Sequence, residues 1–184
     1  MTDRRNVIVL DTETDGLDKL LNRPIEVGYL SWPNADHGPR DLFVPPHTLD
    51  HATPEALNVN GYFQRIARRR RDYTYERTRA LHEALTGNTL AGANIAFDAN
   101  MLTHLFSDAG LRPIDPWHYR LVDIEAYAGG ILGFPPWALP SLNTLCETVG
   151  VPPGDHGAWP DAVAAWHVLT AVAADHVDAL ATAP

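Results

Sequence analysis

Short apolar runs alternate with turn residues along the first part of the chain. Residues 6–10, 25–32 and 41–44 are rich in apolar or β-branched residues, and prolines or polar clusters bound them. Runs of this kind predict strands. Residues 89–93 and 119–124 are two further candidate strands. The pattern therefore predicts several short strands, with three of them early in the chain.

Elsewhere the apolar residues recur at helical spacing. This spacing predicts helices over residues 73–85 and 97–106, each followed by a glycine that ends it. Thr53 is expected to cap a short helix that has Pro54 at its first position. Ser141 precedes another apolar stretch at helical spacing.

The last helix has the clearest pattern. It is predicted to begin near Pro160 and to run to about Leu180, with one buried face. That face would carry Val163, Trp166, Leu169 and Val172. Three strands followed by alternating helices and strands describe an α/β fold, a mixed sheet with helices packed on it. The active site of such a fold is expected at the strand ends.

The composition fits one domain spanning residues 1–184. The chain has 184 residues, 45% of them hydrophobic, which is enough for one sizeable core. Cys146 is the only cysteine, so no internal disulfide can form. The apolar runs are too short for a signal peptide or a bilayer span. We therefore expect a soluble cytoplasmic protein without a membrane partner.

The charge narrows the function. A net charge of −9 weighs against a module that coats nucleic acid, because phosphates would be repelled at long range. It weighs much less against an enzyme that gathers carboxylates around cations. Arg65 and the arginines at 68–71 form the only strongly basic segment. A solvated face and a phosphate-contacting edge are equally good interpretations of it.

Asp11 and Glu13 follow the first predicted strand directly. Residues two apart in a strand point to the same face, so both carboxylates would project into one space. Such a pair is a reasonable site for Mg²⁺ or Mn²⁺, which prefer carboxylate oxygens. Taken alone, this pair is weak evidence for a metal site, and two solvated acids in a turn are the commoner explanation.

Asn94 to Asp98 mark a change from strand to helix. Asp98 would lie in the first helical turn, where the helix dipole favours its ionised, metal-binding form. The alternative is simple and equally good. Asn94 would cap the helix and Phe97 would belong to the core.

His156 lies in a glycine-containing loop ahead of Asp161 at the start of the last helix. A histidine in that position can accept a proton from a metal-bound water near neutral pH. An exposed, idle side chain is the commoner alternative for a single loop histidine.

The three segments together are specific. In their order and spacing, Asp-x-Glu, Asn-x-x-Phe-Asp and His-x(4)-Asp resemble the motifs of the DnaQ-like exonucleases of the DEDDh group, in the ribonuclease H-like superfamily. Residues 23–28, 53–57 and 141–146 extend the resemblance over nearly the whole chain. The third motif is most similar to that of polymerase III epsilon-type proofreading subunits. The tyrosine branch of the family is disfavoured, because Gly157 stands at its tyrosine position.

The resemblance implies a mixed five-stranded sheet with helices on both faces and a hydrolase with two Mg²⁺ or Mn²⁺ ions. Such an enzyme would release nucleoside 5′-monophosphates from the 3′ end of DNA, single-stranded by preference. It implies metal ligation by Asp11, Glu13, Asp98 and Asp161, with His156 as the base. Thr14, Leu17 and Asn94 would contact the substrate, although turn packing explains Leu17 equally well.

Some alternatives stay open. An oligoribonuclease-like or RNase T-like activity on RNA would use the same residues. A polymerase partner in replication or proofreading is compatible with catalysis. A non-catalytic nucleic-acid adaptor is disfavoured, because all five catalytic positions are filled. Ala93 and Asn60 depart from histidines common in the family, and they bear on substrate contacts more than on catalysis.

Overall fold

A mixed five-stranded sheet forms the centre of the molecule. The computed structural model describes residues 5–33, 41–68 and 75–181. The strands are β1 (Val7–Thr14), β2 (Pro24–Trp32), β3 (Asp41–Phe43), β4 (Thr89–Gly92) and the two-residue β5 (Val122–Asp123), in the spatial order β3-β2-β1-β4-β5. The first three pair antiparallel, whereas β4 and β5 continue parallel to β1. The predicted mixed sheet is confirmed.

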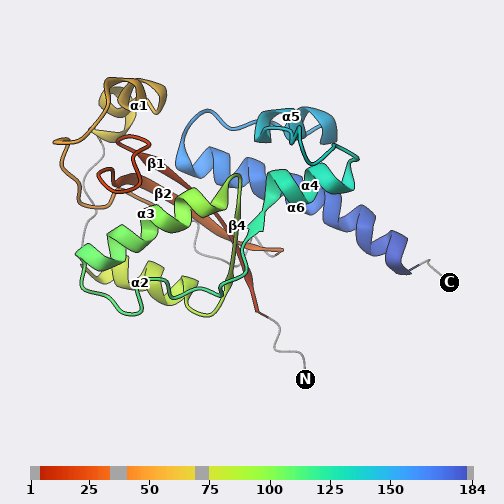
Figure 1. Cartoon of the computed structure of the whole chain (residues 1–184), viewed down its shortest axis with the longest axis horizontal. Helices are drawn as coiled ribbons and strands as arrows, with labels where there is room; N and C mark the ends of the chain where they lie inside the picture. Colours follow the sequence, from red (N-terminus) through yellow and green to blue (C-terminus); the bar gives the residue numbers. More distant parts are fainter. Residues whose placement is uncertain (1–4, 34–40, 69–74, 182–184) are drawn as a thin grey trace.

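Helices cover both faces of this sheet (Figure 1). They are α1 (Pro54–Val59), the π-helical turn η2 (Tyr62–Ile66), α2 (Tyr75–Leu85), α3 (Ile95–Asp108), α4 (Ile124–Ile131), α5 (Leu142–Val149) and α6 (Ala158–Ala181). The predicted Thr53 cap is confirmed, because the Thr53 side chain accepts a hydrogen bond from the first turn of α1. The Ser141 side chain accepts one from the first turn of α5 in the same way.

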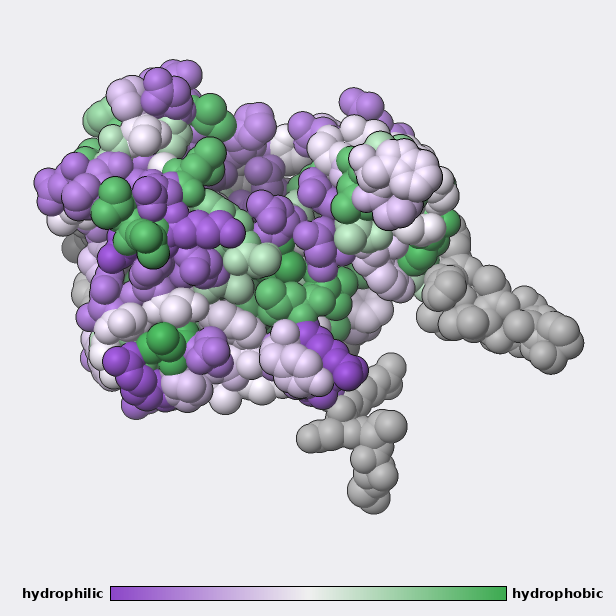
Figure 2. Space-filling view, in the orientation of Figure 1, coloured by the Kyte–Doolittle hydropathy of each residue, from purple (hydrophilic) through white to green (hydrophobic). Residues whose placement is uncertain are grey.

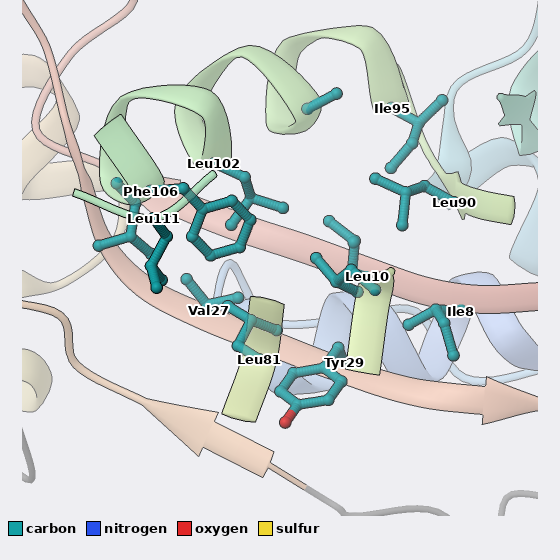
Figure 3. Packing of buried hydrophobic residues seen from close by; sticks show 13 residues of the cluster. Ile8, Leu10, Val27, Tyr29, Leu81, Leu90, Ile95, Leu102, Phe106 and Leu111 are labelled. Atoms are coloured by element: carbon teal, nitrogen blue, oxygen red, sulfur yellow. The ribbon is translucent and has the colours of Figure 1, made fainter. Parts of the chain in front are cut away.

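The alternation of side chains along β1 creates two hydrophobic layers. Ile8 and Leu10 point to one face, where they pack with residues of α2 and α3 such as Leu81 and Phe106 (Figure 3). Val9 points to the other face and joins the cluster of α4, α5 and α6. Burial on both faces fixes the register of β1, since a one-residue slip would exchange the two sets of side chains.

The structure corrects the extent of β1. The acidic cluster was expected to end the strand after Leu10, but the ladder with β2 continues through Asp11 and Glu13. Pairing with β2 supplies the backbone hydrogen bonds and outweighs the low strand propensity of acidic residues. Asp11 and Glu13 are therefore held inside a strand.

The helices also differ from expectation at several points. Sequence patterns did not predict η2 or α4, and α4 contains Gly129 and Gly130, which normally weaken helices. The last helix begins at Ala158, two residues earlier than predicted. Its most buried positions include Ala162, Ala165 and Val168, whereas the predicted Val163 and Trp166 are half-buried. Small alanines let α6 lie close to the sheet.

Within the part of the chain that the structure describes, none of the helices is both long enough and apolar enough to cross a bilayer.

Candidate active site

Three carboxylates from opposite ends of the sequence meet above the sheet. Asp11, Glu13 and Asp161 each offer one oxygen, and these oxygens lie within 4.8 Å of one another. Asp11 and Glu13 point to the same face because they are two apart on β1. Asp161 arrives on the first turn of α6, which packs on β1 and β2. The predicted grouping of these three residues is present in the fold.

Asp98 lies beside this cluster on α3 and is held by Thr12. The Thr12 backbone N–H donates to Asp98 Oδ1 at 2.9 Å, and the Thr12 hydroxyl donates to the same oxygen at 2.7 Å. Both residues are buried. This pairing ties the first turn of α3 to β1 and brings the Asp98 charge near enough to Asp11 to raise the pKa of Asp11.

Burial and mutual repulsion raise the pKa values of the cluster. Burial raises the pKa of Glu13 to about 8, and the Asp161 charge adds to the effect. Burial raises the pKa of Asp98 to about 7, although the bonds from Thr12 oppose it. The pKa of Asp11 is raised well above its usual range by burial and then by Asp98. For Asp98, burial outweighs the helix dipole that was expected to favour ionisation.

These residues fit a divalent cation. Close carboxylates take up protons unless a cation lies among them. Oxygen donors of this kind suit hard ions such as Mg²⁺ and Mn²⁺. The chemistry of the donor set therefore indicates that Asp11, Glu13 and Asp161 could hold a metal ion.

His156 lies on the edge of the cluster with an exposed side chain. Its backbone has a φ of 61°, in the left-handed region that few side chains adopt. The charge of the His156 imidazole and then the His156 backbone oppose the burial that raises the pKa of Asp161. The loop thus lies beside a candidate metal ligand while its imidazole stays accessible.

Gly154 makes room for Asp161. A Cβ atom at this position would overlap Asp161 Oδ1. The absence of a side chain therefore allows the Asp161 carboxylate to lie close to the loop backbone in the position where it joins the cluster.

The three predicted substrate contacts differ in their surroundings. Thr14 is buried, and its hydroxyl donates to the Gly16 carbonyl at 2.8 Å. Leu17 is 78% exposed, so the turn-packing interpretation is wrong. Asn94 is exposed in a left-handed conformation, and within the described chain its side chain makes no capping bond to α3. Asn94 thus stands at the N-cap position of α3 without capping it through its side chain, and Phe97 is half-buried instead of lying in the core.

Sequence patterns missed Glu26 and the use of Arg65. Glu26 is fully buried and lies opposite Glu13 in the β1–β2 ladder. Arg65 Nη1 contacts both of its carboxylate oxygens, at 2.6 and 2.8 Å. A glutamate inside the apolar run 25–32 was the available signal. Arg65 thus pairs with a buried glutamate, which neither the solvated-face nor the phosphate-contact interpretation included. The arginines at 69–71 lie outside the described residues.

Comparisons with known proteins concern the fold and the family of the chain. The chain is similar to E. coli exonuclease I bound to a dA16 oligonucleotide, with 19% identity and a TM-score of 0.71 over 93% of this chain and 41% of that one. A zinc-bound complex of E. coli exonuclease I with single-stranded DNA gives 18% identity and a TM-score of 0.73, over 95% and 42% of the two chains.

A third structure, described as an ExoI/SSB-Ct complex, gives 20% identity and a TM-score of 0.69, with 94% and 42% covered. The chain thus spans about two fifths of the length of these relatives. At this identity the likeness establishes the fold. No curated protein matches by sequence. A family model described as exonuclease (RNase_T) matches residues 8–169. The chain belongs to this exonuclease family.

Proposed function

We propose that this chain is a metal-dependent 3′→5′ exonuclease that releases nucleoside 5′-monophosphates from single-stranded DNA. The observation that carries the proposal is the convergence of Asp11, Glu13 and Asp161 on one point, with Asp98 beside them. An accessible histidine on the loop next to Asp161 completes the set. Metal-assisted phosphodiester hydrolysis uses cation ligands and a base in this combination.

The carboxylates would hold two ions, in keeping with a two-metal site. Asp11, Glu13 and Asp161 would hold one of them, and Asp11 would also face the second, with Asp98 ligating directly or through water. When bound, such ions stabilise the negative charge that develops on the attacked phosphate and on the leaving 3′ oxygen. The raised pKa values of Glu13 and Asp98 support a cation at this point.

His156 would accept the proton of the attacking water. Its exposed imidazole is free to approach the substrate phosphate, and it lies near Asp161, one of the candidate metal ligands. A histidine is suited to this step because its ordinary pKa lies near neutrality.

The 3′ end of the strand would be bound by Thr14, Leu17 and Asn94. Leu17 is well exposed, as a side chain that packs against the terminal base must be before substrate binds. The surface is hollowed between the region of α1 and that of α4 and α5 (Figure 2), and β1 rises toward this hollow (Figure 1). A single strand would enter there.

Single-stranded DNA is proposed because the similar structures are described as complexes with single DNA strands. Parallel digestion of matched 3′-labelled DNA, RNA and short oligoribonucleotides tests the choice. Faster release from DNA supports the proposal. Faster release from RNA would assign an oligoribonuclease-like activity to the same residues. A replication role and a polymerase partner are further parts of this proposal, and co-purification with a polymerase would test them.

A further inference from the structure

An ion pair with a fully buried carboxylate links several segments of the chain around the candidate active site. Arg65 on η2 binds Glu26 on β2 through Nη1, at 2.6 and 2.8 Å. Its remaining nitrogens donate to backbone carbonyls. Nε and Nη2 bond to the Asn60 carbonyl at 3.2 and 2.9 Å, and Nη2 bonds to the His156 carbonyl at 3.2 Å.

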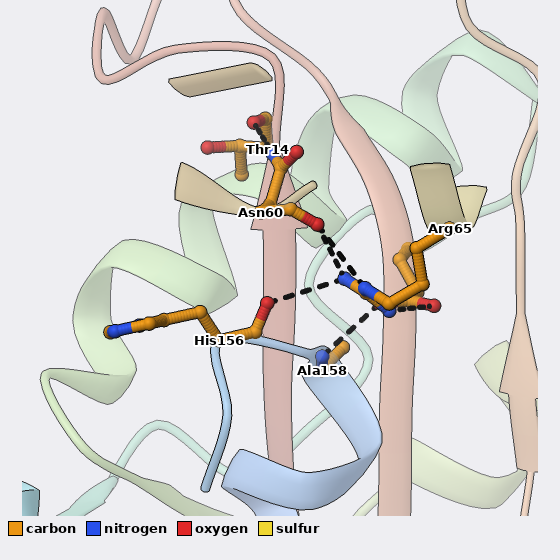
Figure 4. Close-up of polar contacts among 6 residues, drawn as sticks. Thr14, Asn60, Arg65, His156 and Ala158 are labelled. Carbon is orange, nitrogen blue, oxygen red and sulfur yellow. Dashed lines mark hydrogen bonds and ion pairs between the residues drawn. The ribbon is translucent and has the colours of Figure 1, made fainter. Parts of the chain in front are cut away.

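Glu26 also contacts the start of α6, and Arg65 is linked through Asn60 to the end of β1. Glu26 Oε2 accepts the N–H of Ala158, the first residue of α6, at 3.2 Å. Asn60, which Arg65 holds by its carbonyl, donates from Nδ2 to the Thr14 carbonyl at 3.0 Å. Figure 4 shows Arg65 between Asn60 on one side and His156 with Ala158 on the other.

The backbone of His156 is therefore held at its carbonyl, which accepts a hydrogen bond from Arg65. Its φ of 61° is unfavourable for a residue with a side chain, and such conformations persist where the surroundings enforce them. In Figure 4 the imidazole points away from the guanidinium, so the contact leaves the ring free.

The guanidinium also fits closely against the His156 loop, defined here as residues 151–157. A Cβ atom on Gly157 would lie 3.1 Å from Arg65 Nη1. Close packing and directed hydrogen bonds together favour the planar, five-donor guanidinium over any other cation.

We propose that the Glu26–Arg65 ion pair positions His156, by holding the loop backbone in the conformation that presents the imidazole to the attacking water. Arg65 is a positioning residue, because it acts through the backbone of another residue. This inference rests on the proposed function, since it concerns delivery of the base for that reaction.

The choice of variants separates geometry from charge. Arg65→Ala alone would remove the counter-charge of a fully buried carboxylate and would threaten folding. Arg65→Lys keeps the charge beside Glu26 but lacks the fork that reaches two carbonyls. The double variant Glu26→Gln with Arg65→Gln keeps the local net charge and removes the contact to His156. Arg79→Lys is the matched control, because Arg79 pairs with Glu83 on the exposed side of α2.

The test is a double-mutant cycle on kcat with a 3′-labelled DNA strand and Mn²⁺. In a chain that retains His156, Arg65→Lys and the double variant should lower kcat by about tenfold or more, because small misplacements of a reacting group are costly. KM should change little. In a His156→Ala chain, the same changes should alter kcat by less than about twofold, since the positioned group is already absent. Arg79→Lys should have no effect in either chain.

Two measurements that do not use activity accompany the cycle. Amide hydrogen exchange across residues 151–158 should speed up in Arg65→Lys, whereas Mn²⁺ affinity measured by calorimetry should stay as in the parent. Equal losses of kcat in both chains, full activity of Arg65→Lys, or unfolding of both variants would overturn the inference. If the parent chain itself releases no nucleotide, the proposed function fails instead, and the exchange measurement still reports whether Arg65 holds the loop.

Discussion

Thr12 donates both its backbone N–H and its hydroxyl to a single oxygen of Asp98, although the two residues lie 86 positions apart. Thr12 stands between Asp11 and Glu13 and points to the opposite face of β1 from them. The same strand thus carries Asp11 and Glu13 and, through Thr12, also holds the Asp98 carboxylate in place. These bonds oppose the rise that burial causes in the pKa of Asp98.

Thr12→Val should weaken the site through Asp98. Loss of the hydroxyl removes one of the two bonds that favour the ionised carboxylate, so the pKa of Asp98 should rise above about 7. Activity at neutral pH should fall and should recover partly at higher pH, with a stability loss of about 1 kcal/mol. Rates across pH and a urea melt measure both effects. Thr103→Val is the control, because the Thr103 hydroxyl bonds only within α3. An unchanged pH–rate profile would contradict the role of Thr12.

The metal-free protein should lose stability as pH rises. The pKa of Glu13 is raised from 4.5 to about 8 and that of Asp98 from 3.8 to about 7. Between these limits the folded chain binds more protons than the unfolded chain, so the free energy of unfolding falls as pH increases. Melting temperatures in EDTA, taken from about pH 5 to about pH 8, measure the trend.

Two comparisons sharpen that experiment. Added Mg²⁺ should raise the melting temperature more at the upper end of the range, since ionised carboxylates bind cations best. Glu13→Gln should flatten the pH dependence, because one of the shifted groups is gone. If stability in EDTA instead increased over this pH range, folding would not raise the pKa values of these carboxylates.

Gly154→Ala should impair catalysis without unfolding the chain. The added methyl group would overlap Asp161 Oδ1 and turn the carboxylate away from Asp11 and Glu13. A shift of this size should cost about a hundredfold in rate. Gly130→Ala is the control, because a Cβ atom there meets open space. Equal activity of the two alanine variants would exclude the proposed restriction at Gly154.

His156→Ala should slow hydrolysis by about 10² to 10⁴, the usual contribution of a general base. The slope of the rate against pH near neutrality should also change, because the base is lost while the metal ligands remain. His167→Ala, at an exposed position on α6, is the matched control. Steady-state rates over a pH series provide the measurement, and a profile that superimposes on that of the parent would rule out His156 as the base.

Local rules were enough for much of the fold. Thr53 was identified as a cap because a cap depends on residues only three positions away. Asp11 and Glu13 were placed on one face by the two-residue period of a strand. The bounds of β1 were not predictable in this way, since its second half is held by pairing with β2.

Long-range contacts account for what was missed at the site. The Thr12–Asp98 bonds and the Glu26–Arg65 pair join residues far apart in sequence, and no local pattern encodes them. Arg65 belongs to a basic segment that suggested solvent or phosphate, but its partner is a buried glutamate on the sheet. The residues that could carry the chemistry were therefore visible in sequence, whereas those that hold them in place required the fold.

The most direct test of the central claim uses a single DNA strand with distinct labels on its two terminal nucleotides. With Mg²⁺, the parent chain should release the 3′ label first, as a nucleoside 5′-monophosphate, and EDTA should stop the release. Asp11→Asn should stay folded and release none, because it removes a carboxylate central to the cluster. Undiminished release by Asp11→Asn, or first release of the 5′ label, would contradict a metal-dependent 3′→5′ exonuclease.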